Sequence, residues 1–298
     1  YAEILGIIGW FRNNVGAQYA YAFNRLASVT SNPSPMHFKQ LQKCAAHVYK
    51  HRKLGWTCHG MNSDYSPGIP ELEDLKPNDL YILFDANFGT EDTSCPQVCA
   101  QAYYGHACVL DISIQVKLTA MATAEAEVIA SCEAVKLAVF VRKCLAELRF
   151  PVTGPVPCFG DNASQIALSK KSHPSRKCRW WRTRVDWTQS LQDLGIVSFH
   201  KIAGVNNASD CGTKIQAVCH WEGLSRPIVG APPMFIPGTQ INVRLAQQVA
   251  KEERELRATS ATSPTSKSPS VKSSRPDQLQ DKDSVATKGS EVTSRELR

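Results

Sequence analysis

Four acidic residues are spaced along the chain in positions where a folded sheet would bring them together. Asp85 and Asp161 each follow a short apolar run typical of a buried strand, so we expect their carboxylates side by side at one sheet edge. Glu127 falls in the first turn of a long predicted helix, and Asp210 opens a final helical turn. Four such carboxylates repel one another unless cations neutralise them. The pattern predicts that all four are both catalytic residues and metal ligands.

The chemistry that suits such a site is phosphodiester hydrolysis with two Mg²⁺ or Mn²⁺ ions about 3.5–4 Å apart. Each acid also has an ordinary structural interpretation. An Asp after a strand is often a turn or cap residue, as Asp161 before Asn162 illustrates. The helix macrodipole favours a Glu such as Glu127 in a first turn in any case. The joint order of the acids, rather than any one of them, favours the catalytic interpretation.

A basic segment follows the third acid. Residues 170–184 contain seven Lys or Arg residues, one His and no acid. Lys and Arg bind phosphates, and aromatic rings pack on sugars or bases, so the segment favours nucleic-acid contact. The alternative is a solvated basic face with its tryptophans half in the core. The residues predicted to bind nucleic acid are Lys170, Lys171, Arg176, Lys177, Arg179, Trp180, Trp181, Arg182 and Arg184.

Histidines and cysteines supply weaker candidates. His200 precedes the last acid and is a possible catalytic helper, although we expect it within a strand. The spacing of Cys95, Cys99, His106 and Cys108 matches no standard zinc finger or knuckle, so buried thiols are the better interpretation. Eleven cysteines without a secretory signal indicate reduced thiols and an intracellular protein, in a cytoplasmic particle or the nucleus.

Hydrophobic patterning predicts the elements that position these residues. Strands are expected at 80–84, 102–110, 112–119, 156–160 and 196–202. The main helix is expected from Thr123, acting as a cap, to about Leu148, and shorter helices are expected around 163–168 and 182–194. Small residues on the face of Glu127 would let the main helix approach the sheet closely. The order favours an α/β fold in which helices flank a mixed sheet.

Four regions are predicted along the chain: a helical segment at 1–57, a linker at 58–78, the α/β domain at 79–225 and a tail at 226–298. Residues 258–298 include 15 Ser or Thr among 41 residues, which predicts disorder. The apolar run at 1–11 is too short to span a bilayer, so no membrane role is expected. The net charge of +7 permits nucleic-acid binding without requiring it.

Residues 80–215 resemble the ribonuclease H (RNase H) domain of copia-type LTR retrotransposon Pol polyproteins. Residues 121–130 are similar to that family's Leu-Ser-Thr-Ala-Glu-Ala-Glu-Tyr-Ile-Ala motif, and residues 160–168 to its Cys-Asp-Asn-Gln-Ser-Ala-Ile-Ala-Leu motif. Residues 209–214 parallel Ala-Asp-Ile-Leu-Thr-Lys, and residues 84–89 parallel Ser-Asp-Ala-Asp-Trp-Ala-Gly. Residues 1–55 resemble the end of the family's reverse transcriptase, so the chain is expected to be the C-terminal end of such a polyprotein.

This resemblance implies an RNase H-like mixed five-stranded sheet and a metal-dependent endoribonuclease that cleaves the RNA of RNA–DNA hybrids during reverse transcription. It implies the hybrid and the remainder of the polyprotein, including the reverse transcriptase, as partners. The family's catalytic acids fall on Asp85, Glu127, Asp161 and Asp210. The chain departs from the family pattern at Asn87, Phe88, Gly160, Cys211 and Gly212.

Two other functions stay open at this point. The departures from the motifs would suit a catalytically inactive retrotransposon remnant that acts only as a nucleic-acid-binding or structural module. A relative of the same fold that cuts DNA or transfers strands is disfavoured by the specific motif around Glu127, although the fold alone does not separate these activities.

Overall fold

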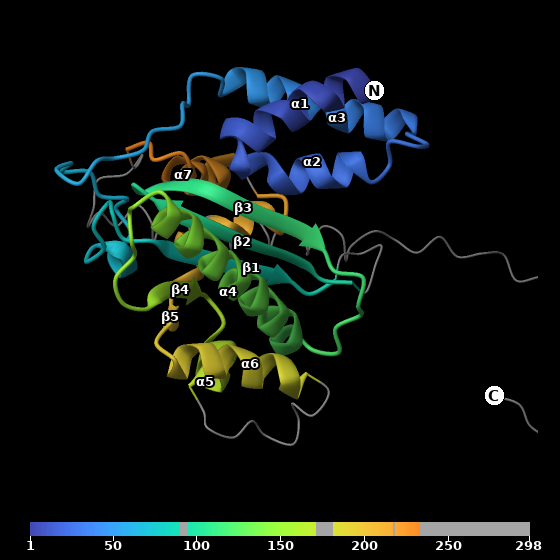
Figure 1. Cartoon of the computed structure of the whole chain (residues 1–298). Helices are drawn as coiled ribbons and strands as arrows, with labels where there is room; N and C mark the ends of the chain where they lie inside the picture. Colours follow the sequence, from blue (N-terminus) through green and yellow to red (C-terminus); the bar gives the residue numbers. More distant parts are fainter. Residues whose placement is uncertain (90–94, 171–180, 217, 233–298) are drawn as a thin grey trace, which may run out of the picture. The chain divides into compact units, whose positions relative to one another are not determined.

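The computed structural model describes residues 1–89, 95–170, 181–216 and 218–232 (Figure 1). These residues all belong to one compact unit, which spans residues 1–246. In this part of the chain no helix combines the length and apolarity needed to cross a membrane.

A mixed five-stranded sheet in the order β3-β2-β1-β4-β5 forms the centre of this unit. The first three strands form an antiparallel meander. Strand β4 pairs in parallel with β1, and β5 pairs in parallel with β4. Parallel neighbours need crossover connections, and helices α4, α5 and α6 supply them here. The strands are β1 (Tyr81–Asn87), β2 (Gln97–Tyr104), β3 (Ala107–Gln115), β4 (Val156–Gly160) and β5 (Val197–Lys201). The predicted mixed five-stranded sheet flanked by helices is confirmed.

Helix α4 (Thr123–Glu147) packs along one face of the sheet (Figure 1). Its sheet-facing side chains are small, since Ala126, Ala130, Ala134 and Ala138 are all fully buried. Small side chains let the helix backbone approach the strands closely, as predicted. This approach carries the N-terminal turn of α4, with Glu127, to the sheet. Helices α5 (Ala163–Ser169) and α6 (Arg182–Asp193) pack near β5.

The other face of the sheet is covered by aromatic and aliphatic side chains from several segments, including Tyr81, Tyr103, Trp221 and Ile228. The short 3-10 helices η4 (Gly204–Asn206) and η5 (Ala208–Gly212) follow β5, and α7 (Val218–Ile228) comes next. Helix α7 packs against η5 and β3.

The N-terminal helices are α1 (Ala2–Val15), α2 (Ala20–Ala27) and α3 (Pro35–Lys50), with the 3-10 turn η1 (Ala17–Tyr19) between the first two. Ser34 caps helix α3, and Pro35 occupies its first turn. Arg12 pairs with Asp111 of β3 at 2.5 Å, and Asn24 donates a hydrogen bond to the Ser113 carbonyl at 2.5 Å. The helices thus pack directly on the sheet.

Two predicted element boundaries are wrong for reasons of backbone geometry. The predicted strand at 102–110 is interrupted by a two-residue hairpin turn at Gly105 and His106, whose φ angles are +66° and +54°. A turn of this kind needs positive φ at both positions, and His gave no signal for it. Strand β1 also continues to Asn87, so Asp85 lies within the strand rather than at its end.

Two further boundaries differ at helix ends. Helix α4 has Ala122, not Thr123, at its N-cap position, and no side chain caps it there. Glu125 instead accepts a hydrogen bond from the Met121 amide at 2.8 Å. The predicted tail at 226–298 starts too early, because Ile228 and Val229 are buried with the core. A further 3-10 helix, η2, spans Pro70–Leu72 within the predicted linker.

Candidate active site

Three acidic side chains converge where β1, β4 and the start of α4 meet. Asp85 lies on β1, Asp161 directly follows the neighbouring strand β4, and Glu127 lies near the start of α4. One carboxylate oxygen from each residue lies within 4.8 Å of the others. Asp85 and Glu127 are buried, and Asp161 is partly exposed. The structure therefore brings together three of the four predicted acids as one group.

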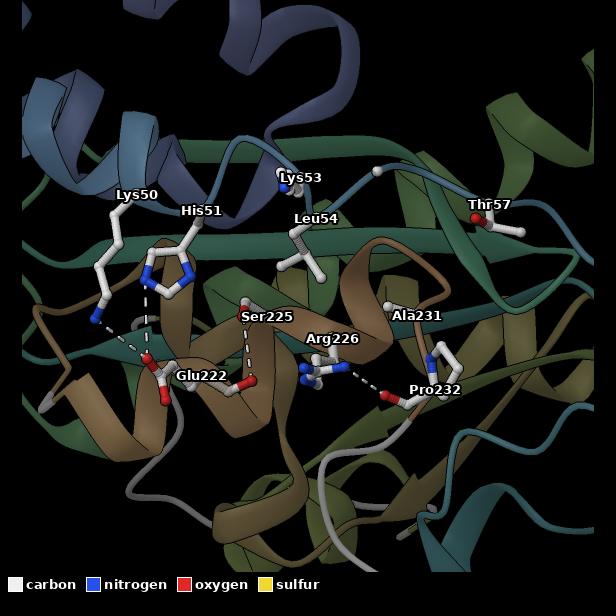
Figure 2. Close-up of a pocket in the computed structure, with 11 residues that line it drawn as sticks. Lys50, His51, Lys53, Leu54, Thr57, Glu222, Ser225, Arg226, Ala231 and Pro232 are labelled. Carbon is white, nitrogen blue, oxygen red and sulfur yellow. Dashed lines mark hydrogen bonds and ion pairs between the residues drawn. The ribbon is translucent and has the colours of Figure 1, made fainter.

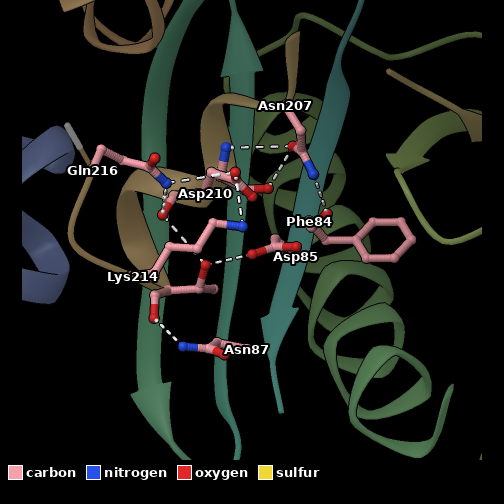
Figure 3. Close-up of polar contacts among 9 residues, drawn as sticks. Phe84, Asp85, Asn87, Asn207, Asp210, Lys214 and Gln216 are labelled. Carbon is pink, nitrogen blue, oxygen red and sulfur yellow. Dashed lines mark hydrogen bonds and ion pairs between the residues drawn. The ribbon is translucent and has the colours of Figure 1, made fainter. Parts of the chain in front are cut away.

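The fourth acid, Asp210, lies beside this group in η5 and has a partner of its own. Its Oδ2 atom is 2.9 Å from the Lys214 ammonium nitrogen (Figure 3). The Gln216 side-chain amide also donates to its backbone carbonyl at 3.3 Å and to Oδ2 at 3.5 Å. Asp210 is 5% exposed, so these contacts form in a largely dry setting.

Neighbouring polar groups fix the segment that carries Asp210 onto β1. Asn207 donates a hydrogen bond to the Phe84 carbonyl at 3.0 Å, and its own side-chain oxygen accepts from the Ser209 hydroxyl at 2.6 Å (Figure 3). The Thr213 hydroxyl donates to the Asp85 carboxylate. Asp85 is thus held by η5 as well as by its strand.

Thr213, Lys214 and Gln216 were not among the residues predicted for the site. Thr213 and Lys214 belong to the motif at 209–214, so the signal was present as their spacing from Asp210. A helical turn places Lys214 on the same side as Asp210, four residues earlier.

The charges of the acids interact strongly. Burial raises the pKa of Glu127 to about 9, and the carboxylates of Asp85 and Asp161 add to the rise. Burial and Asp85 likewise raise the pKa of Asp210 to about 7, and the same two causes raise the pKa of Asp161. Each acid is held at a cost in its ionised form, which is the condition that a bound cation would relieve.

The same negative charges stabilise the positively charged form of Lys214. Burial lowers the pKa of its ammonium group, but the carboxylates of Asp85, Asp210 and Asp161 more than offset this, so the pKa is raised overall. Lys214 is therefore charged at neutral pH and lies within the field of all these acids.

Two carboxylate oxygens at the site are buried without a hydrogen-bond partner among the described residues: Oε2 of Glu127 and Oδ1 of Asp210. Buried polar atoms are nearly always paired, so an unpaired carboxylate oxygen signals a missing ligand. Mg²⁺ and Mn²⁺ prefer carboxylate oxygens. The residues Asp85, Glu127 and Asp161 fit a divalent ion of this kind.

Only some of the predicted nucleic-acid-binding residues lie in the part of the chain that the structure describes. Lys171, Arg176, Lys177, Arg179 and Trp180 lie outside the described residues. Of the others, Lys170, Arg182 and Arg184 are at least partly exposed, and Arg182 pairs with Asp186 at 3.3 Å.

Trp181 has a packing role. It is 8% exposed and packs with Val128 and Cys132 of α4 and Val185 of α6. Its ring is not available to stack on a base, so for this residue the alternative of a core position applies.

His200 lies on β5, as expected. Its Nε2 is 2.8 Å from the Ser198 hydroxyl, and its ring lies 5.3 Å from that of Phe159. Burial and the nearby Lys170 lower its pKa. Cys95, Cys99, His106 and Cys108, for which buried thiols were the better interpretation, form no group with metal-ligand spacing; among the described residues the acidic group is the one found with such spacing.

A separate pocket of about 660 Å³ lies between the end of α3 and α7 (Figure 2). Two of its positive residues have local partners: Lys50 lies 3.8 Å from Glu222, and Arg226 donates to the Pro232 carbonyl at 3.0 Å. Lys50 and Arg226 also occupy last turns of helices, where positive charge offsets the macrodipole.

No protein-family model matches the chain, and no curated protein sequence matches it. Similar solved structures include RNase H1 from the halophilic archaeon Halobacterium salinarum NRC-1, with 13% identity over 45% of this chain and 94% of that one, at a TM-score of 0.35. LC11-RNase H1 in complex with an RNA/DNA hybrid gives 12% identity, coverage of 45% and 94%, and a TM-score of 0.35.

An N-terminal RNase H domain from Mycobacterium tuberculosis, solved as a fusion with maltose-binding protein, gives 8% identity, coverage of 50% and 96%, and a TM-score of 0.36. Similarities at this level support no conclusion about function, which must come from the site.

Proposed function

We propose that the chain is a metal-dependent ribonuclease that cleaves the RNA strand of RNA–DNA hybrids, as part of a copia-type retrotransposon Pol polyprotein. The observation that carries the proposal is the convergence of Asp85, Glu127 and Asp161 within 4.8 Å, from two adjacent strands and one helix of an RNase H-like sheet. The buried Oε2 of Glu127, which has no hydrogen-bond partner among the described residues, supports it, because carboxylate oxygens are the ligands that Mg²⁺ and Mn²⁺ prefer.

A divalent ion bound by these three residues would activate a water molecule and polarise the scissile phosphate. The protein's own contribution is to hold the carboxylates rigidly. Asp85 is fixed by β1 and by the Thr213 hydroxyl, and Glu127 by the close approach of α4. Rigid placement matters because ligands already in position cost little reorganisation during the reaction.

The choice of an RNA–DNA hybrid as substrate rests on the sequence motifs at 121–130 and 160–168, which resemble those of the copia-type RNase H domain. The described basic residues Lys170, Arg182 and Arg184 would contribute phosphate contacts, with a strong dependence on salt. The same resemblance implies an intracellular location and the reverse transcriptase as a partner.

The test is cleavage of an end-labelled RNA–DNA hybrid by the whole chain in Mg²⁺ and in Mn²⁺. Single-stranded RNA, double-stranded RNA and double-stranded DNA serve as substrate controls. Asp161→Asn removes one metal ligand, and Asp74→Asn is the matched control, since Asp74 is an exposed acid outside the group. We expect hybrid-specific cleavage by the wild type and Asp74→Asn, and none by Asp161→Asn.

The alternative, a catalytically inactive nucleic-acid-binding or structural remnant, gives a different result. A folded chain that binds the hybrid without cleaving it in either metal would establish that alternative and refute the ribonuclease. Equal cleavage by wild type and Asp161→Asn would point to a contaminating nuclease.

A further inference from the structure

The pocket between the end of α3 and α7 collects positive charge from two separate segments. Lys50 ends α3 and Lys53 follows it on one wall of the pocket, and Arg226 of α7 lines the other wall (Figure 2). Glu222 is the only acid among the described residues of the lining. Three positive side chains thus face one negative side chain, and a recess with a surplus of positive charge concentrates anions.

Glu222 does not neutralise this charge. Its Oε1 atom lies 3.8 Å from the Lys50 ammonium nitrogen and 3.8 Å from Nε2 of His51, and both distances are too long for hydrogen bonds. The Lys50 side chain is 65% exposed, so water screens its interaction with the acid. Nε2 of His51 is buried and has no hydrogen-bond partner among the described residues. The pocket therefore keeps most of its positive charge.

His51 reports the sign of the electrostatic potential inside the pocket. Burial lowers the pKa of its ring, Lys50 lowers that pKa further, and Glu222 raises it by less than Lys50 lowers it. Arg226, on the other wall, adds a smaller decrease. Neighbouring cations thus disfavour a proton on His51, which means that the potential there is positive even with Glu222 close by. A bound anion would reverse this effect.

Helix ends explain only part of this charge. Lys50 and Arg226 lie in last turns, where a cation offsets the macrodipole, but that effect does not extend past the last turn. Lys53 lies beyond the end of α3, is exposed, and forms no ion pair with any described residue. At α7 the Ala231 amide donates to the Arg226 carbonyl at 2.9 Å, so the backbone itself closes that helix. Capping therefore leaves Lys53 and most of the Arg226 donors unexplained.

We propose that this pocket binds a ligand that carries two or more phosphate groups, with Lys53 contacting it from one wall and Arg226 from the other. Ammonium and guanidinium groups are common donors to phosphate oxygens. Arg226 uses Nη1 for the Pro232 carbonyl at 3.0 Å, but a guanidinium has five N–H donors, so this bond does not exhaust its capacity. More than one phosphate is needed because the cations lie on opposite walls instead of converging on one point (Figure 2).

The size and exposure of the pocket favour a nucleic-acid strand as the source of these phosphates. Its volume of about 660 Å³ lies within the range of small-molecule sites, about 300–1,000 Å³. Lys50 and Lys53 are exposed, so the pocket is open along that wall and a strand can enter and leave it. A free polyphosphate has the same chemistry and is the other source. The inference does not rest on the ribonuclease proposal, because the pocket and the acidic group share no residue.

The experiment follows the His51 ring by NMR in the whole chain, with isotopically labelled histidine rings and with EDTA present to exclude metal. His51→Gln identifies the His51 signal among those of the eight histidines. The chain is titrated separately with inorganic tripolyphosphate and with a short oligothymidine strand that lacks terminal phosphates. A response to oligothymidine assigns the ligand to a nucleic-acid strand, and a response to tripolyphosphate alone assigns it to a free polyphosphate.

Two pairs of variants test the charges. Lys53→Glu reverses the charge of one wall, and Lys43→Glu is its matched control, since Lys43 is an exposed residue of α3 outside the lining. Glu222→Gln removes the acid, and Glu73→Gln is its matched control, since Glu73 is exposed and outside the lining. The two members of a pair change the net charge equally, so a difference between them reports the pocket itself.

We expect the His51 signal of the wild type to shift to saturation with at least one probe. Lys53→Glu should weaken that binding at least about tenfold, and Glu222→Gln should strengthen it about two- to fivefold, while both controls bind like the wild type. An unmoved His51 signal with both probes would overturn the inference. Equal weakening in Lys53→Glu and Lys43→Glu, or weaker binding in Glu222→Gln, would overturn it too.

Discussion

Two carboxyl groups of this molecule, the partly buried Asp111 and the buried Glu127, differ in how their negative charge is balanced. Asp111 lies on β3, and the Arg12 guanidinium of α1 contacts it at 2.5 Å. Burial raises the pKa of Asp111, the arginine lowers it, and the result is about 6. Burial raises the pKa of Glu127 to about 9, with further increases from Asp85 and Asp161. One carboxyl has an internal cation beside it, and the other has an unpaired oxygen.

This difference separates a structural acid from a functional one. The Arg12–Asp111 pair joins the N-terminal helices to the sheet, and its role is complete within the chain. Glu127 lies among other acids in an arrangement that costs stability, and such a cost indicates a site that binds something the chain itself does not supply. The comparison leads to a set of predictions, taken from the largest effect on free energy to the smallest.

Breaking the structural pair should have the largest effect on stability. Arg12→Met leaves the partly buried Asp111 without its cation, which should cost about 3 kcal/mol, the lower end of the range for removing one partner from a fully buried pair. Arg12→Met combined with Asp111→Leu should recover most of this loss, because no charge then remains buried. Urea unfolding curves of the three proteins measure both effects. A loss below about 1 kcal/mol in Arg12→Met would show that the pair is solvent-screened.

Neutralising the proposed metal ligand should affect activity first. Glu127→Gln removes one of the three carboxylates proposed to bind the ion, and we expect hybrid cleavage to fall at least about 100-fold, since even partners outside the ligand set contribute 10- to 100-fold. That factor corresponds to about 2.7 kcal/mol. The same variant should be more stable than the wild type in EDTA at pH 8, because Gln does not have to take up a proton when it is buried there. A variant that is both less active and less stable would mean that Glu127 has a structural role.

The glycines that depart from the retrotransposon motifs should prove to be required by the packing of neighbouring side chains, rather than to be destabilising substitutions. A Cβ atom at Gly160 would lie 2.5 Å from the ring of Phe84, so that ring leaves no room for a side chain at position 160. Gly160→Cys should therefore cost about 1–3 kcal/mol through overpacking. Phe84→Ser should reduce that cost in the double variant, as a double-mutant cycle would measure. Additive effects would show that the two positions are independent.

A similar constraint applies at Gly212, whose added Cβ would collide with the Cys99 side chain. Sequence motifs alone made Gly160 and Gly212 look like departures from a working pattern. The structure gives each of them a packing reason, because the residue that fills the space comes from another strand.

The convergence of Asp85, Glu127 and Asp161 could be predicted from the sequence because the patterns that indicate it are local. A strand with an acid at its end, and a helix with small residues on the face of Glu127, can both be recognised from neighbouring residues. The positions of Lys214 and Trp181 could not be predicted in this way. Lys214 matters through its contact with Asp210, and Trp181 is buried because α6 packs on α4, which are both tertiary effects.

The smallest predicted effect, counted per pH unit, is a dependence of stability on pH in the metal-free chain. The pKa of Glu127 is raised to about 9, so the folded state keeps a proton that the unfolded state releases near pH 4.5. Stability from this group is fully present below about pH 4.5 and is lost as the pH rises toward 9, by at most about 1.4 kcal/mol per pH unit.

Urea midpoints in EDTA between pH 6 and 9, compared with those of Glu127→Gln, isolate this contribution. Asp111 titrates with the same sign but lower, near pH 6, so it adds little above pH 7. Mg²⁺ should flatten the dependence, because the ion binds the ionised carboxylates. A wild type and a Glu127→Gln variant with parallel pH curves would contradict the assigned environment.

The most direct test is the anomalous diffraction of crystals of the whole chain soaked in Mn²⁺. The account predicts an anomalous peak bounded by the carboxylates of Asp85, Glu127 and Asp161, at about 2.0–2.3 Å from their oxygens, and none at Asp111, where Arg12 already supplies the charge. Carboxylates that stand in the described arrangement and bind no Mn²⁺ would contradict it.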